Sequence, residues 1–163
     1  MNLPKRKPTR LKDYDYSSEG AYFITICSHN RKDIFGIIVG QGLAPAENQL
    51  YPFGEIAKYE LLDLETRYKN IKVDKYVIMP NHIHAIIFIE KTAGASPCPT
   101  LSDMVCSFKS ITTRKCHLIK HDIKIWQRSF HDHIIRGEED YLKIWQYIDT
   151  NPQKWEEDCF FTE

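Results

Sequence analysis

The chain has 163 residues and a formal net charge of zero, with 42% hydrophobic and 12% aromatic residues. This length suits one domain with a full core, and the apolar content excludes an intrinsically disordered chain. No apolar run approaches the ~20 residues that span a bilayer, and no apolar segment follows the basic start MNLPKRKPTRLK. Neither a membrane span nor a secretory signal is therefore predicted.

Cysteine spacing and charge distribution add further limits. The five cysteines show no CxxC spacing, which argues against a zinc ribbon and a disulfide framework and favours a reducing cytoplasm. Because basic residues are clustered, the neutral total can hide a cationic face, although ordinary solvated charge is the alternative. The clusters are Lys5, Arg6, Lys7, Arg10 and Lys12 near the start, and Lys109, Arg114, Lys115 and Lys120 later.

The first half of the chain predicts an arm, two strands and a helix. Residues 1–20 have two prolines, many charges and no period, so they are expected to form a basic arm before a single domain over residues 21–163. Residues 22–27 predict a strand, and residues 34–39 are its expected hairpin partner. After a loop over 40–48, apolar residues recur every three or four positions, which predicts a helix from 52 to 68.

The second half predicts three strands and two helices. The expected elements are strands at 72–79 and 82–89 joined by Pro80-Asn81, a loop at 91–99, a helix after the capping box Thr100–Asp103, a strand at 130–136 and a helix from 138 to Pro152. Short strands with hairpin links and a few helices indicate an α+β fold on a mostly antiparallel sheet.

His82 and His84 form the first candidate site. Residues two apart on a strand point to the same face, so the two imidazoles can bind one metal ion from a rigid strand. Ile86 and Phe88 continue the face of the histidines, and the apolar residues 83, 85, 87 and 89 fill the opposite face. Both faces therefore look covered, and the strand is expected to be central. Pro80-Asn81 places the pair at the start of the strand, near an edge that a substrate can reach. Buried histidines that only make hydrogen bonds are the alternative, and His131-Asp-His133 competes for the ligand role.

Tyr147 and Asn151 form the second candidate site. They lie four residues apart on the last predicted helix, together with Asp140 and Lys143, so a phenol and an amide share a polar face. An amphipathic tyrosine beside the core is the alternative. Tyrosine can form a covalent phosphotyrosine link, and a divalent ion can polarise phosphate oxygens. An amide oxygen from Asn151 beside the two imidazoles suits Mg²⁺ or Mn²⁺, and Lys143 lies one turn before Tyr147.

Together these residues resemble a known family. The chain is similar to the single-tyrosine HUH transposases, and more closely to the REP-associated tyrosine transposases. The shared motifs include Tyr76-Val-Ile-Met-Pro-Asn-His-Ile-His84, Ser107-Phe-Lys-Ser110, Trp126-Gln-Arg128, His133-Ile-Ile-Arg136 and Tyr147-Ile-Asp-Thr-Asn-Pro152. The resemblance implies an RRM-like or ferredoxin-like palm whose sheet carries the histidine pair on a central strand.

The resemblance also implies an activity. Tyr147 would be the nucleophile, His82, His84 and Asn151 the metal ligands, and a 5′-phosphotyrosine with a free 3′-hydroxyl the product. The substrate would be single-stranded DNA with a hairpin, as in REP-like palindromes, and the amino-terminal arm would help to read a flanking tetranucleotide. The expected location is a bacterial cytoplasm, at the nucleoid, and the sequence leaves monomer and homodimer open. Expected DNA contacts are Lys5, Arg6, Lys7, Arg10, Lys109, Arg114, Lys115, Arg128, Arg136 and Lys143.

Two other functions remain open at this point. A histidine-triad nucleotide hydrolase needs a third alternating histidine, and Ile86 occupies that position. A domesticated binding module with an RRM-like fold would hold hairpins without cutting them.

Overall fold

A four-stranded antiparallel sheet forms the centre of the molecule. The computed structural model describes residues 10–40, 45–91 and 98–161. The strands β4 (Ile71–Ile78), β5 (His82–Ile89), β1 (Gly20–Cys27) and β6 (His131–Ile135) lie side by side in this order. Each adjacent pair is antiparallel. The sheet and the central position of β5 confirm the predictions.

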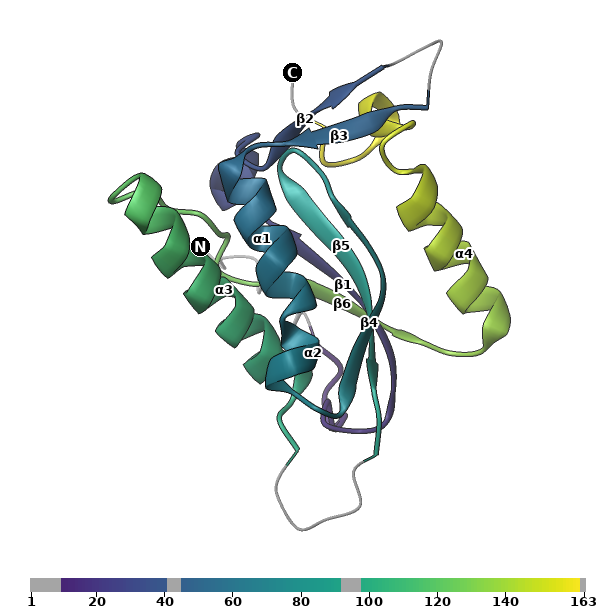
Figure 1. Cartoon of the computed structure of the whole chain (residues 1–163). Helices are drawn as coiled ribbons and strands as arrows, with labels where there is room; N and C mark the ends of the chain where they lie inside the picture. The colour runs from purple at the N-terminus through teal and green to yellow at the C-terminus, as the bar shows by residue number, and fades with distance from the viewer. Residues whose placement is uncertain (1–9, 41–44, 92–97, 162–163) are drawn as a thin grey trace, which may run out of the picture.

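Helices cover the two faces of the sheet unequally. The helices α1 (Pro52–Leu62), α2 (Leu64–Arg67) and α3 (Leu101–Ile119) lie on one face, and α4 (Glu138–Thr150) lies on the other (Figure 1). The predicted α+β class is thus confirmed. The single helix expected over 52–68 is two helices, α1 and α2, with the turn residue Asp63 between them.

The predicted partner of the first strand is wrong. Strand β2 (Gly36–Val39) pairs with β3 (Glu47–Leu50) in a separate two-stranded sheet. The reason is that β5 and β6 already occupy both edges of β1, which leaves β2 no backbone groups to bond there. The loop expected over 40–48 therefore contains the start of β3, while residues 41–44 lie outside the described part.

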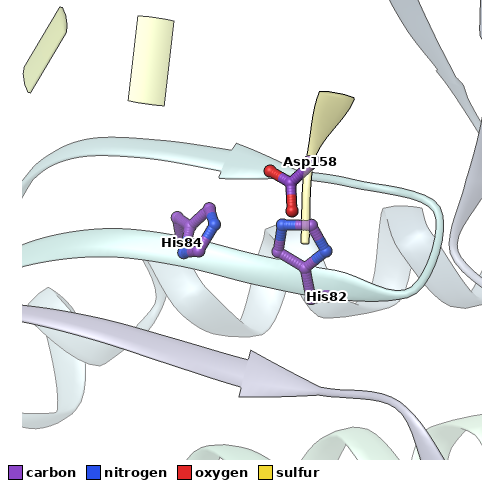
Figure 2. Close-up of side chains that lie close together, drawn as sticks. All are labelled: His82, His84 and Asp158. Carbon is purple, nitrogen blue, oxygen red and sulfur yellow. The ribbon is translucent and has the colours of Figure 1, made fainter. Parts of the chain in front are cut away.

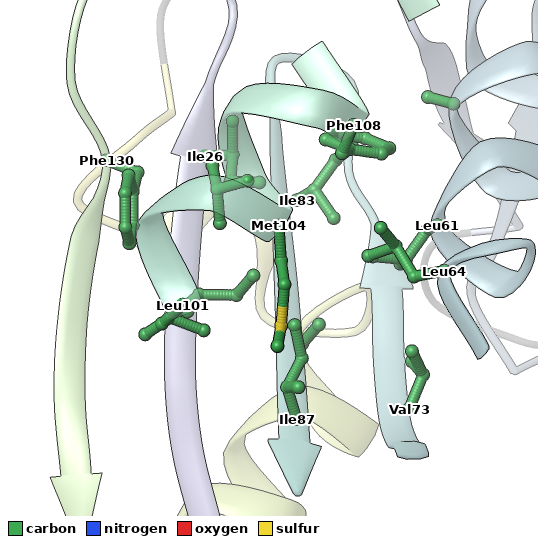
Figure 3. Close-up of a cluster of buried hydrophobic side chains, with 14 of the residues drawn as sticks. Ile26, Leu61, Leu64, Val73, Ile83, Ile87, Leu101, Met104, Phe108 and Phe130 are labelled. Atoms are coloured by element: carbon green, nitrogen blue, oxygen red, sulfur yellow. The ribbon is translucent and has the colours of Figure 1, made fainter. Parts of the chain in front are cut away.

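The hydrophobic core lies between the sheet and the face of α1 and α3. Ile83 and Ile87 of β5 point into it, and Leu101, Met104 and Phe108 of α3 meet them from the helix layer (Figure 3). Since successive strand residues face opposite sides, packing Ile83 and Ile87 inward commits their even-numbered neighbours to the α4 side.

The segments around the core are fixed by local hydrogen bonds. The capping box at the start of α3 is confirmed: the Thr100 hydroxyl accepts from the Asp103 amide, and the Asp103 carboxylate accepts from the Thr100 amide. In the described part of the predicted arm, Tyr16 is buried and its carbonyl accepts from the Leu101 amide at 3.1 Å. Residues 1–9, with Lys5, Arg6 and Lys7, lie outside the described residues.

None of the helices in residues 10–40, 45–91 and 98–161 combines the length and apolarity that crossing a bilayer requires.

Phe108 provides a test of the core. Its side chain is fully buried and its ring lies 5.3 Å from that of Trp126. Phe108→Ala should lower the free energy of unfolding by about 3–5 kcal/mol, because it removes apolar contacts and leaves a cavity. Urea denaturation measures the change. Leu118→Ala, at a position that is 81% exposed, should change stability little; equal losses in both variants would contradict this packing.

Candidate active site

His82 and His84 lie together on β5, on the face opposite the core. Their ring centroids are 4.4 Å apart, as expected for alternate residues of one strand. The side chains are 0% and 1% exposed, so the expectation of an open position near a sheet edge is wrong. The pair is buried because α4 and the segment after it fold over this end of the strand.

Asn81 determines which nitrogen of His82 carries the hydrogen. The Asn81 amide nitrogen donates to the carbonyls of Arg31 and Phe160, at 3.2 and 2.9 Å. Its Oδ1 therefore faces Nδ1 of His82, at 2.9 Å. A side-chain amide oxygen can only accept, so Nδ1 of His82 must be the donor.

The remaining nitrogen of His82 is available to a ligand. With the hydrogen on Nδ1, a neutral imidazole presents a lone pair on Nε2. This Nε2 is buried and has no hydrogen-bond partner among the described residues. A histidine that donates one ring N–H to a fixed oxygen and directs its other nitrogen to an unfilled position is the usual arrangement of a metal ligand.

His84 is held from both sides. Its Nδ1 lies 2.8 Å from the Thr25 hydroxyl, which comes from the neighbouring strand β1. Its Nε2 lies 3.3 Å from the Tyr147 hydroxyl. The ring also stacks on Phe23 at a centroid distance of 5.1 Å. These contacts fix the direction in which the imidazole presents Nε2.

Helix α4 brings Tyr147 to the histidines of the same chain. The side chain is 40% exposed, yet its hydroxyl points inward to His84. Asn151, one turn later at the helix end, is 2% exposed. The structure therefore brings together all four residues predicted for catalysis and metal binding: Tyr147, His82, His84 and Asn151.

The C-terminal cover, residues 155–161, completes the site. Its Asp158 reaches the histidine pair from a segment that follows α4 (Figure 2). The Asp158 carboxylate accepts from the Tyr147 hydroxyl at 3.2 Å and from the amide of Asn151. The Phe160 ring lies 4.5 Å from that of His82. The sequence reasoning missed this cover, because nothing in the sequence marks a return of the chain after Pro152.

Sequence reasoning also missed the partners of the two imidazoles. Asn81 stands directly before His82, inside a motif already noted, so its proximity could have been inferred. Thr25 could not, because the register of β1 against β5 pairs it with His84 only in the folded sheet.

Burial keeps both imidazoles neutral. It lowers the pKa of His82 to about 4, although the negative charge of Asp158 opposes this effect. Burial also lowers the pKa of His84 well below its ordinary value, with a smaller contribution from His82. Neutral imidazoles are the form that binds metal ions.

The phenol of Tyr147 is in its protonated form. Burial raises its pKa far above the ordinary value, and the charge of Asp158 raises it further. A phenol next to a carboxylate donates to it and resists ionisation.

The donor atoms of His82, His84 and Asp158 could hold one metal ion. One donor from each lies within 4.8 Å of the others. The Asn151 Oδ1 is a further buried oxygen without a hydrogen-bond partner in the described part of the chain. A set of two imidazole nitrogens and two side-chain oxygens fits a divalent cation.

The competing pair His131 and His133 lies elsewhere. Both are exposed on the edge strand β6, and His133 Nε2 bonds to the Asp140 carboxylate at 2.8 Å. Neither joins the His82–His84 cluster.

Several predicted DNA contacts are engaged with other groups. Lys109 donates to the carbonyls of Gln127 and Ser129, and burial lowers its pKa to about 8. Lys115 pairs with Glu60, and Lys143 pairs with Glu139 at 2.7 Å. Arg10 lies over Phe130 with a distance of 4.6 Å to the ring centroid. Arg114, Arg128 and Arg136 are exposed, and Lys115 and Lys143 are also exposed although each pairs with a glutamate.

The predicted basic residues therefore do not share one site. Lys109, Arg114 and Lys115 belong to α3, on the face of the sheet opposite α4 (Figure 1). Tyr147 belongs to α4, on the other side of the sheet.

A relative that matches nearly the whole chain shows its family. The chain is 35% identical to a protein of Haemophilus influenzae (strain Rd) described as an uncharacterized protein, over 97% of this chain and 94% of the relative. The chain belongs to the family of this Haemophilus protein. No protein-family model matches the chain.

Solved structures share the fold of this family. One is a REP-associated tyrosine transposase bound to a REP hairpin, with a TM-score of 0.63 and 20% identity, over 90% of this chain and 73% of that one. Another, from Deinococcus radiodurans R1, is provisionally named a transposase, with a TM-score of 0.50 and 18% identity, over 86% of this chain and 95% of that one. At these identities the likeness establishes a common fold.

The lowered pKa of His82 has a consequence for stability. From about pH 7 to about pH 5 the unfolded chain protonates this residue, whose ordinary pKa is 6.5, while the folded chain does not. The free energy of unfolding should therefore decrease as the pH is lowered over this range, and His82 should account for roughly 2 kcal/mol of the decrease. Urea denaturation in the presence of EDTA measures the fall, which should be smaller in His82→Gln. An equal fall in both proteins would show that His82 does not titrate this way.

Proposed function

We propose that this chain is a metal-dependent enzyme of the REP-associated tyrosine transposase type. It cleaves and rejoins single-stranded DNA beside hairpins, in the manner of REP-like palindromes, through a 5′-phosphotyrosine link to Tyr147. The observation that carries the proposal is the 3.3 Å contact between the Tyr147 hydroxyl and Nε2 of His84. His84 and its neighbour His82 are both buried, and both imidazoles are neutral. A nucleophile and a cation site meet there within one chain.

The residues fit a divalent ion. His82, His84 and Asn151 would hold it, and Asp158 is an additional donor that the fold supplies. When bound, Mg²⁺ or Mn²⁺ would polarise the phosphate oxygens and neutralise the charge that develops during strand cleavage. The unpartnered Nε2 of His82 and Oδ1 of Asn151 support this assignment, because buried polar atoms without partners are costly unless a ligand satisfies them.

The proposed cleavage is a direct displacement at phosphorus. Tyr147 Oη forms a bond to the scissile phosphorus while the bond from phosphorus to the 3′ oxygen breaks. The 3′ oxygen leaves with the electron pair and takes a proton from solvent, and the phenol proton passes to solvent. The phosphotyrosine conserves the energy of the bond, so a 3′-hydroxyl can attack it and restore the strand.

Access to the phosphate requires a change at the C-terminal cover. In the present arrangement Tyr147 donates to Asp158, and burial and this carboxylate raise the pKa of the phenol. The phenol must release Asp158 before its oxygen can attack. Because Phe160 lies against both imidazoles, the cover and the substrate phosphate occupy adjoining space.

The same contact favours a second candidate function. A phenol held protonated by Asp158 is unreactive, which suits a domesticated module that binds hairpin DNA without cutting it. The likeness in fold to a transposase bound to a REP hairpin is compatible with both functions. Only a covalent product separates them.

Tyr147→Phe tests the nucleophile. The parent protein, incubated with Mn²⁺ and a labelled hairpin oligonucleotide with single-stranded flanks, should form a covalent band on a denaturing gel. The variant should form none, because it lacks the attacking oxygen but keeps the ring. Tyr141→Phe, on the same helix, is the matched control and should retain the band. A parent protein that binds the hairpin without any covalent product would favour the binding module.

His82→Ala tests the separation of binding from chemistry. Cleavage should fall by at least about 100-fold, because a metal ligand is lost, while affinity for the hairpin should stay within about 2-fold. His133→Ala removes the exposed histidine of the competing pair and should leave cleavage unchanged. A loss of binding equal to the loss of cleavage would count against this division.

A further inference from the structure

A cavity of about 470 Å³ lies beside the candidate active site. It opens between the hairpin of β2 and β3 and the C-terminal cover. Ile37, Tyr51, Trp155 and Phe161 supply its apolar and aromatic lining, and Asp33 supplies a carboxylate. Neither the predicted catalytic residues nor the predicted DNA contacts belong to it.

The cavity adjoins the histidine pair through two residues. Pro80, in its wall, is followed directly by Asn81 and His82. The Trp155 ring lines the cavity and also lies 5.8 Å from the ring of His82. A strand of DNA with its phosphate at Tyr147 would thus place a neighbouring nucleotide within reach of the cavity.

The aromatic side chains of the lining are available to a ligand. Tyr51 is 42% exposed and Phe161 is 36% exposed, although both border the cavity. The rings of Phe161 and Trp155 form a T-shaped pair with a centroid distance of 5.4 Å and an interplanar angle of 82°. Aromatic faces of this kind are the platforms on which unpaired bases stack.

The charge of the cavity selects a base over a phosphate. Its lining, among the described residues, contains no lysine, arginine or histidine, whereas Asp33 is acidic. A phosphate would meet a like charge and no cation. Burial raises the pKa of the Asp33 carboxyl, while its hydrogen bond with Asn81 acts in the opposite direction. A carboxylate accepts hydrogen bonds from the exocyclic amino groups of bases, as it does from cytosine N4.

We propose that this cavity binds one unstacked, amino-bearing nucleobase of the single strand next to the scissile phosphate. This inference rests on the proposed single-stranded substrate. Tyr51 and Phe161 stack on the base, and Asp33 accepts from its amino group. Thymine presents a carbonyl oxygen where cytosine presents the amino group, so the cavity discriminates against thymine.

Binding to short oligonucleotides tests the proposal without requiring catalysis. Fluorescein-labelled oligo-dC and oligo-dT of about twelve nucleotides are titrated with the full chain in EDTA, at neutral pH, and anisotropy is recorded. The parent should bind oligo-dC at least about 5-fold more tightly than oligo-dT. In Asp33→Asn the ratio should fall below about 2-fold. Loss of the negative charge at Asp33 should alter the affinities for oligo-dC and oligo-dT alike. A change in the ratio of these two affinities therefore reports the contact between Asp33 and the base.

Leucine substitutions test the stacking platforms. Tyr51→Leu and Phe161→Leu keep apolar volume but remove the aromatic face, and each should weaken oligo-dC binding by about 5-fold. Tyr59→Leu, at a 62% exposed position on α1, is the matched control and should bind like the parent. Circular dichroism checks that each variant is folded.

The outcomes separate this inference from the proposed function. Equal affinity of the parent for the two oligomers, or weakening by Tyr59→Leu as large as that by Tyr51→Leu and Phe161→Leu, would overturn the inference. A parent that forms the phosphotyrosine product but shows no base preference would overturn the inference alone. Base preference without any covalent product would overturn the proposed chemistry alone.

Discussion

The site depends on the alternation of side chains along β5, where residues facing the hydrophobic core alternate with residues facing α4. Ile83 and Ile87 enter the core, so the register of this strand cannot slip by one residue without burying His82 and His84 among aliphatic side chains. Pairing with β4 on one side and β1 on the other fixes the strand further. The two imidazoles therefore project from an inner strand that is paired on both sides.

Partners from several segments then orient these imidazoles. Asn81 fixes the hydrogen on Nδ1 of His82, and Thr25 contacts Nδ1 of His84 from the next strand. Asn81 is itself held by the carbonyls of Arg31 and Phe160, so the loop after β1 and the C-terminal cover both contribute to the geometry of His82. This arrangement leaves the Nε2 of His82 without a hydrogen-bond partner among the described residues, whereas the Nε2 of His84 contacts the Tyr147 hydroxyl.

The C-terminal cover links the chemistry to the neighbouring cavity. Asp158 contacts Tyr147 and Asn151, whereas Trp155 and Phe161 line the cavity, and Trp155 also lies beside the ring of His82. A substrate that displaces Asp158 from the phenol therefore acts on the same short segment that borders the proposed base site. Phosphate and base would then be recognised beside the same stretch of seven residues, 155–161.

The sequence by itself determined the elements whose signals are local. Alternating residues predicted β5, periodic apolar residues predicted α3, and the spacing of Thr100 and Asp103 predicted its capping box. It also identified Tyr147, His82, His84 and Asn151 as one group, because the motifs around them resemble a known family. Only the tertiary structure decided the rest. The pairing of β2 with β3 depends on the edges of β1 being occupied, and the burial of the histidines depends on a segment more than seventy residues further along the chain. Asp158, Thr25 and the cavity beside Trp155 arise from contacts between distant segments, and such contacts leave no periodic or short-range pattern in the sequence.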